Sequence, residues 1–174
     1  WAYAGYAVLG ALAVLALIRL QTGRLKRSHH LASIERDLEL TGAVQSGFLP
    51  RDSPIASGDL QLRGFYRPAG ICSGAWWWYE MTSDGRHVLL VGDVTGHGPG
   101  PAMVTAAVAS TYRAQTKVAG GLPLGDRLEA INEEVLAVGR GIYQMALTAV
   151  EIDCQRGEVH AYSAGGLPAI VMAE

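Results

Sequence analysis

The stretch of sequence that decides the fold is HVLLVGDVTGHGPGP, residues 87–101. Its apolar beginning, residues 87–91, follows the turn-forming SDGR at 83–86, which predicts a short buried strand. Four glycines then lie around Asp93 and His97 and predict a tight loop that opens onto a helix. A carboxylate and an imidazole are thereby expected where a buried strand ends.

Strands and helices alternate on both sides of this loop. Residues 102–117 are small, apolar and free of proline, and residues 124–138 repeat apolar side chains at helical spacing, so both favour helices. Apolar or alternating runs that are typical of strands occur at 60–65, 87–91, 144–153, 158–163 and 167–172. We therefore expect an α+β domain with two helices on a largely antiparallel sheet.

The first 18 residues contain no charged side chain, and only Gly5 and Gly10 fall outside the hydrophobic class. As a helix they would be about 27 Å long, at the lower limit for crossing a bilayer. Four basic residues follow between positions 19 and 27, and positive charge marks the cytoplasmic side of a span. We expect a transmembrane helix at 1–20 in the inner membrane, with the rest in the cytoplasm. A secretory signal peptide fits less well because its charges precede the apolar run; a buried core helix is the other alternative.

Residues 21–48 form a connector with helical periodicity. Its apolar positions, three or four apart in each half, are Leu31, Ile34, Leu38, Leu40, Val44 and Phe48. A helix with one apolar stripe needs a cover. That cover is either the following domain or a second copy of the chain in a parallel coiled coil, which would make a homodimer.

Charge and length limit the function of the remaining chain. The protein has 174 residues, with 14 basic and 16 acidic side chains. Only four basic residues precede Glu35, so from Glu35 onward the chain carries ten basic and all 16 acidic side chains, a net charge of −6. This argues against nucleic-acid binding, which depends on contacts to phosphates. Cys72 and Cys154 are too few for a disulfide framework.

Asp93 is the residue most suited to chemistry. At the end of an apolar strand its charge must be met by a cation or by several N–H groups. A carboxylate with neighbouring carbonyl oxygens suits Mg²⁺ or Mn²⁺, and His97 could transfer a proton nearby. The alternative is structural: Asp93 would cap the helix that follows.

Several motifs occur here in the order found in one family. They are QSGFLP at 45–50, YRPAG at 66–70, DGR at 84–86, VGDVTGHG at 91–98 and SAGG at 163–166. Together they resemble SpoIIE/RsbU-type serine phosphatases, bacterial members of the PPM metal-dependent protein phosphatases. The resemblance implies an αββα sandwich over 49–174, a partial one that lacks its C-terminal part. It also implies two Mn²⁺ or Mg²⁺ ions that activate water for hydrolysis of phosphoserine or phosphothreonine.

The same resemblance assigns residues to roles. It makes Asp93 the metal-bridging carboxylate, the carbonyl of Val94 a further ligand, and His97 the motif histidine, a candidate for catalysis. Where relatives carry acids, this chain has Ala75 and Trp78, and where they carry a histidine it has Gly166. The last metal-binding Asp of the family would lie beyond residue 174. The metal site is therefore expected to be degenerate, with Glu80 the nearest spare acid.

Three hypotheses follow. The favoured one is a membrane-anchored pseudophosphatase that signals by binding a phosphoprotein or scaffold, because Ala75 is a loss within the sequence itself. The alternatives are an active Mn²⁺- or Mg²⁺-dependent phosphatase completed by residues beyond 174, and a structural component of a membrane assembly. The run Trp76, Trp77 and Trp78 either packs on both faces of the sheet or forms a surface for a partner.

Overall fold

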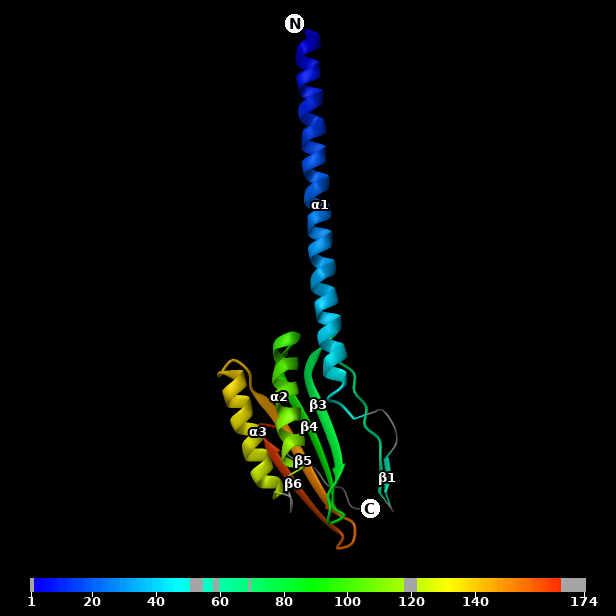
Figure 1. Ribbon diagram of the computed structural model, residues 1–174, viewed down its shortest axis with the longest axis vertical. Helices are drawn as coiled ribbons and strands as arrows, with labels where there is room; N and C mark the ends of the chain where they lie inside the picture. Colours follow the sequence, from blue (N-terminus) through cyan, green and yellow to red (C-terminus); the bar gives the residue numbers. More distant parts are fainter. Residues whose placement is uncertain (1, 51–54, 58–59, 69, 118–121, 167–174) are drawn as a thin grey trace. The chain divides into compact units, whose positions relative to one another are not determined.

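A computed structural model of the chain describes residues 2–50, 55–57, 60–68, 70–117 and 122–166 (Figure 1). The chain divides into two compact units, Trp1–Asp37 and Leu38–Glu174. The strand predicted at 167–172 lies outside the described residues.

Helix α1 (Ala2–Ser46) forms the first unit and continues into the second. It confirms the helical conformation expected for the connector. In the first unit all described side chains from residue 14 to residue 37 are exposed. Among the described residues no helix is both long and apolar enough to cross a membrane, so the span predicted at 1–20 is not supported.

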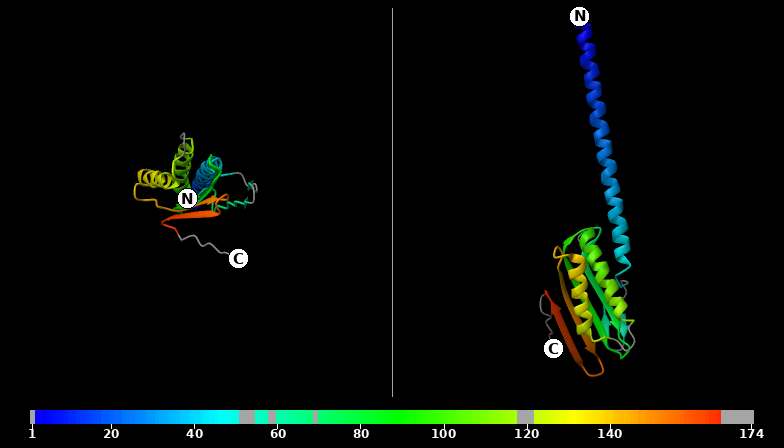
Figure 2. Two further views of the ribbon diagram at one scale, coloured as in Figure 1. Left: turned by 90° about the horizontal axis from the view of Figure 1, so that it is seen from below. Right: turned by 60° about the vertical axis from the view of Figure 1, so that its left-hand side comes forward.

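The second unit contains a four-stranded antiparallel sheet covered on one face by two helices (Figure 2). The sheet has the order β3 (Ser73–Met81), β4 (His87–His97), β5 (Met145–Asp153) and β6 (Glu158–Ala164). The helices are α2 (Pro99–Gln115) and α3 (Leu124–Gly139), and a separate two-stranded sheet pairs β1 (Ile55–Ser57) with β2 (Leu60–Leu62). The expected α+β class and both expected helices are confirmed.

Strand β4 is longer than the sequence predicted. It pairs with β5 as far as Val94 and with β3 as far as His97, so it does not end at Val91. Asp93 therefore lies within a paired strand and not in a loop. The turn comes later, where Gly96 and Gly98 adopt positive φ angles of 94° and 90° that favour glycine.

The hydrophobic core lies between the sheet and the two helices. Because side chains alternate along a strand, every second residue of β3 and β4 faces the helices. The core is centred on Trp76, Leu90, Val108 and Tyr112, which are buried almost completely. The opposite face of the sheet, called the open face below, carries Ala75 and Trp77 on β3 and Val91 and Asp93 on β4.

The three tryptophans do not form an exposed surface for a partner. Trp76 is 1% exposed beneath α2, and Trp77 is 8% exposed on the open face. A Cβ at Gly64 would lie 2.1 Å from the indole of Trp77, so the segment before β3 covers that ring. Trp78 is half-buried, with the guanidinium of Arg113 5.4 Å from its ring. The partner-surface prediction is wrong for Trp76 and Trp77, because alternation buries them on opposite faces.

A buried polar cluster joins β3 to both helices. The carboxylate of Glu80 accepts hydrogen bonds from the hydroxyl of Tyr112, at 2.9 Å, and from the guanidinium of Arg127. That guanidinium lies 4.2 Å from the centre of the Tyr112 ring. Burial, and then the nearby Glu80 carboxylate, raises the pKa of Tyr112 far above its usual value, so Tyr112 remains a donor.

Candidate active site

Asp93 lies on the open face of β4, between two alanines. In the strand register its cross-strand partner on β3 is Ala75, and its partner on β5 is Ala146. Asp93 is exposed, so water can solvate its charge. The cation or N–H groups that we expected for a buried carboxylate are therefore not required. Nor does Asp93 cap α2, because Gly98 is the N-cap residue and no side chain caps this helix.

Ala75 is therefore one of the two residues that lie directly opposite Asp93. Directly opposed residues of an antiparallel pair have Cβ atoms about 5 Å apart, close enough for two carboxylates to share a cation. A methyl group in that place cannot bind a metal ion. Trp78 belongs to the other face of β3, so this substitution does not affect the surroundings of Asp93.

Neither Glu80, at the far end of β3, nor Gly166, after β6, supplies a carboxylate beside Asp93. Glu80 points to the helix face and is already bound by Tyr112 and Arg127. Gly166 follows β6, where its carbonyl oxygen accepts a hydrogen bond of 3.2 Å from the hydroxyl of Ser163. Within the described residues, no three His, Cys, Asp or Glu side chains lie close enough together to hold a metal ion. The residues present thus do not fit the two-metal centre that the motifs imply.

The backbone around Val94 is tightly packed against β3. A Cβ at Gly74 would lie 2.3 Å from the carbonyl oxygen of Val94, and the β3–β4 pairing is irregular between Ser73 and Ala75. Only a glycine fits at position 74 without moving the strand. The role of the Val94 carbonyl as a metal ligand stays a prediction.

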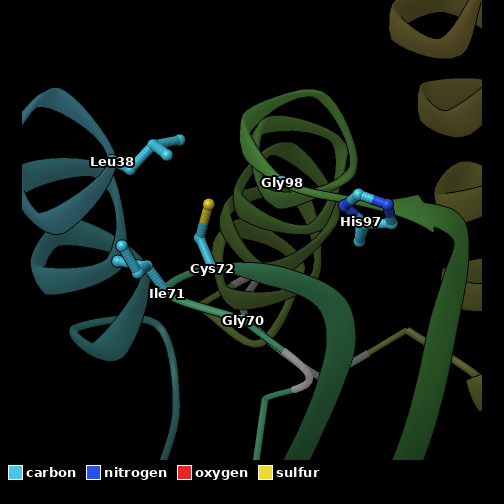
Figure 3. Close-up of a pocket in the computed structure, with 6 residues that line it drawn as sticks. All are labelled: Leu38, Gly70, Ile71, Cys72, His97 and Gly98. Atoms are coloured by element: carbon cyan, nitrogen blue, oxygen red, sulfur yellow. The ribbon is translucent and has the colours of Figure 1, made fainter. Parts of the chain in front are cut away.

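His97 is exposed at the end of β4, where Ser73 is its cross-strand partner. It lines a mostly apolar cavity of about 330 Å³ together with Leu38, Ile71 and Cys72. Figure 3 shows Leu38 and Ile71 on the α1 side of this cavity, His97 beyond the start of α2, and the sulfur of Cys72 directed into the space between them. His97 and Asp93 thus lie on the same strand, β4.

Sequence reasoning missed two residues that hold the start of β3. Gln45, buried near the end of α1, accepts a hydrogen bond from the backbone N–H of Ser73 at 3.1 Å and donates one to its carbonyl. The hydroxyl of Thr105 on α2 lies 3.0 Å from the carbonyl oxygen of Gly74 and 2.9 Å from that of Pro101, so its one proton is shared between these two acceptors. The available signal for Gln45 was a single polar residue at helical spacing from apolar ones, which favours a buried hydrogen bond at that position.

Comparisons with known proteins identify the family and agree with the fold described above. A family model described as Stage II sporulation protein E (SpoIIE) matches residues 83–174, slightly more than half of the chain. The chain belongs to the SpoIIE family. The matched part contains Asp93, Val94, His97 and Gly166, whereas Ala75 and Trp78 precede it.

One curated relative of this SpoIIE-family chain is a phosphatase. It is 24% identical to the phosphoserine phosphatase RsbP of Bacillus subtilis (strain 168) over 140 residues, 78% of this chain. The chain spans only 34% of the length of RsbP. The SiaA-PP2C domain of Pseudomonas aeruginosa has a similar fold, with a TM-score of 0.60 and 16% identity over 77% of this chain and 55% of that one. The expected SpoIIE/PPM-type phosphatase domain is thus confirmed.

Proposed function

We propose that this SpoIIE-family domain is a pseudophosphatase, which keeps the phosphatase fold and acts by binding a protein partner in bacterial signalling. The partner is a phosphoprotein or a scaffold protein, as in the family's signalling context. The catalytic Mn²⁺ or Mg²⁺ centre of this SpoIIE-family domain is degenerate, and the domain no longer hydrolyses phosphoserine or phosphothreonine.

One observation carries this proposal: the strand register places Ala75 opposite Asp93. The other cross-strand neighbour of Asp93 is Ala146, so methyl groups flank the carboxylate on both sides. Mg²⁺ and Mn²⁺ need several oxygen ligands, and one exposed carboxylate binds such an ion weakly. The alternative, an active phosphatase, would need the missing carboxylates from residues beyond 174.

The deciding experiment adds the missing ligand and measures Mn²⁺ binding by calorimetry. We expect the native chain to bind Mn²⁺ weakly and to release no phosphate from a phosphoserine protein in its presence. The variant Ala75→Asp should bind Mn²⁺ at least about tenfold more tightly, equivalent to about 1.4 kcal/mol. The control Val91→Asp adds the same charge to the same face, two residues from Asp93, and should gain less.

Two results would contradict the proposal. Mn²⁺-dependent phosphate release by the native chain, abolished by Asp93→Asn, would show an active phosphatase. Equal Mn²⁺ affinities for Ala75→Asp and Val91→Asp would show that position 75 is not the lost ligand. The membrane anchor and the homodimer through residues 21–48 stay predictions.

A further inference from the structure

Helix α1 carries two consecutive kinds of exposed surface within the first unit. The first, called the aliphatic segment below, is residues 14–18; its larger side chains are between 51% and 58% exposed, namely Val14, Leu15, Leu17 and Ile18. The second, called the basic segment, is residues 19–27; its charged side chains are exposed as well, namely Arg19, Arg24, Lys26 and Arg27. Figure 1 shows α1 as one uninterrupted helix, so the order of the two segments along its axis is fixed.

The aliphatic segment is apolar around its whole circumference. Successive residues of an α-helix are rotated by about 100°, so the five side chains of residues 14–18 leave no arc wider than about 100° without an aliphatic group. A coiled coil covers only a narrow stripe of each helix and would leave the rest of this surface in water. The interior of a bilayer surrounds a helix on all sides. The pattern therefore favours lipid over a second helix as the cover of this segment.

The basic segment is not neutralised by acids of its own helix. It contains four basic and no acidic residues, a net charge of +4, and the first acid of the sequence is Glu35. Glu35 lies eight positions beyond Arg27, about 12 Å along the helix, which is too far for an ion pair. The layer of lipid headgroups is about 5–8 Å thick, and flexible Arg and Lys side chains reach it from positions further along a helix. The basic segment is therefore suited to anionic headgroups beside the aliphatic segment.

We propose that residues 14–27 of α1 bind the surface of a membrane that contains anionic lipids. The aliphatic segment enters the edge of the hydrocarbon layer, and the basic segment binds the phosphate groups of the headgroups. This contact does not require the span predicted at 1–20, because a helix that reaches only the boundary between headgroups and acyl chains also binds lipid. It is independent of the proposed loss of hydrolysis, because neither Asp93 nor Ala75 takes part.

The test is co-sedimentation of the full 174-residue chain with vesicles of phosphatidylglycerol, which is anionic, or of phosphatidylcholine, which is not. We expect at least about tenfold tighter binding to the anionic vesicles, since each basic side chain near the surface adds about fivefold. Arg27→Gln should therefore weaken this binding about fivefold. The matched control Arg36→Gln removes an exposed charge from the same helix between two acids, Glu35 and Asp37, and should weaken it less than about twofold. Equal binding to both vesicles, or equal losses for the two variants, would overturn the proposal.

A second pair of variants separates a membrane from other polyanions. Leu17→Gln should weaken binding to the anionic vesicles at least about tenfold, because it removes an aliphatic side chain from lipid. The control Leu31→Gln changes a side chain that is 65% exposed beyond the basic segment, and it should act less than about twofold. The proposal fails if these two variants act alike, or if millimolar glycerol phosphate displaces the chain, because a free phosphate would then be the ligand. It also fails if duplex DNA binds the chain as tightly as the vesicles do and Leu17→Gln leaves the binding of DNA unchanged.

Discussion

Replacing Arg127 by methionine tests the buried polar cluster that joins β3 to the helices. The Arg127 side chain is 5% exposed and the Glu80 side chain is 16% exposed, so both charges of this ion pair are largely removed from water. Breaking a buried pair by removing one partner costs about 3–5 kcal/mol, because the other charge remains uncompensated. Glu80 would keep its hydrogen bond from Tyr112 and some contact with water. We therefore expect Arg127→Met to lower the free energy of unfolding by about 3 kcal/mol, the lower end of that range.

The assay is urea unfolding followed by tryptophan fluorescence, with the slope m checked for constancy between variants. The control Arg113→Met removes an exposed guanidinium that stacks on Trp78, and it should cost less than about 1 kcal/mol. The double variant Glu80→Met/Arg127→Met removes both charges. Its cost should be smaller than the sum of the single costs by at least about 2 kcal/mol.

Equal losses for Arg127→Met and Arg113→Met would contradict the importance of the buried ion pair. Additive losses of the two single variants in the double variant would show that Glu80 and Arg127 are not coupled. In either case the core would depend on apolar packing alone.

Three further substitutions test the structure by the same unfolding assay. Gly74→Ala should lower the free energy of unfolding by about 1–3 kcal/mol, because the new Cβ would meet the carbonyl oxygen of Val94. Gly125→Ala has open space in α3 and should raise the free energy of unfolding by about 0.5–1 kcal/mol. Equal effects would contradict the close packing at Gly74. Thr105→Val should cost about 0.5–1.5 kcal/mol by removing the hydrogen bond that the buried hydroxyl donates to the carbonyl oxygen of Gly74 or of Pro101, and a neutral result would mean that the bond is unimportant. Hydrogen bonds from Arg86 and Thr82 lower the pKa of Asp84 to about 2 from 3.8. This carboxylate thus contributes stability above about pH 4 that is lost as the pH falls towards 2. Because Asp84 is exposed, Asp84→Asn should reduce the difference in the free energy of unfolding between pH 5 and pH 2 by less than about 1 kcal/mol. An unchanged difference would contradict the pairing of Asp84 with Arg86.

The regular elements could be predicted from the sequence because their patterns are local. The period of about 3.6 in residues 124–138 and the alternation around the turn at 154–157 depend only on neighbours in the chain. The end of β4 could not be predicted in this way. Glycines at 92 and 96 indicate a loop from residue 92 onward, but pairing with β3 at Asp93 and with β5 at Val94 keeps the strand going past Gly92, and the backbone turns only at Gly96. Tertiary pairing thus outweighed the local preference of glycine.

The site was predictable only in part, for a similar reason. Motif order singled out Asp93 and position 75, but their direct opposition depends on the register of two strands, which no local pattern determines. The exposure of Asp93 was also missed, since an apolar run says that a strand is buried but not which of its faces is covered. For the tryptophans, alternation alone was sufficient, and the interpretation in which they pack on opposite faces was the correct one.

The division of the sheet into two faces explains how this fold can persist without the expected ligand. The core residues Trp76, Leu90 and Tyr112 lie on the helix face, whereas Ala75 and Asp93 lie on the open face, so position 75 contributes little to core packing. Two carboxylates directly opposite each other would repel, at a cost of about 0.2–1 kcal/mol when no cation lies between them. An alanine at position 75 removes this repulsion. With no cation between the two strands, an Asp at position 75 would therefore make the sheet less stable than the alanine that is present.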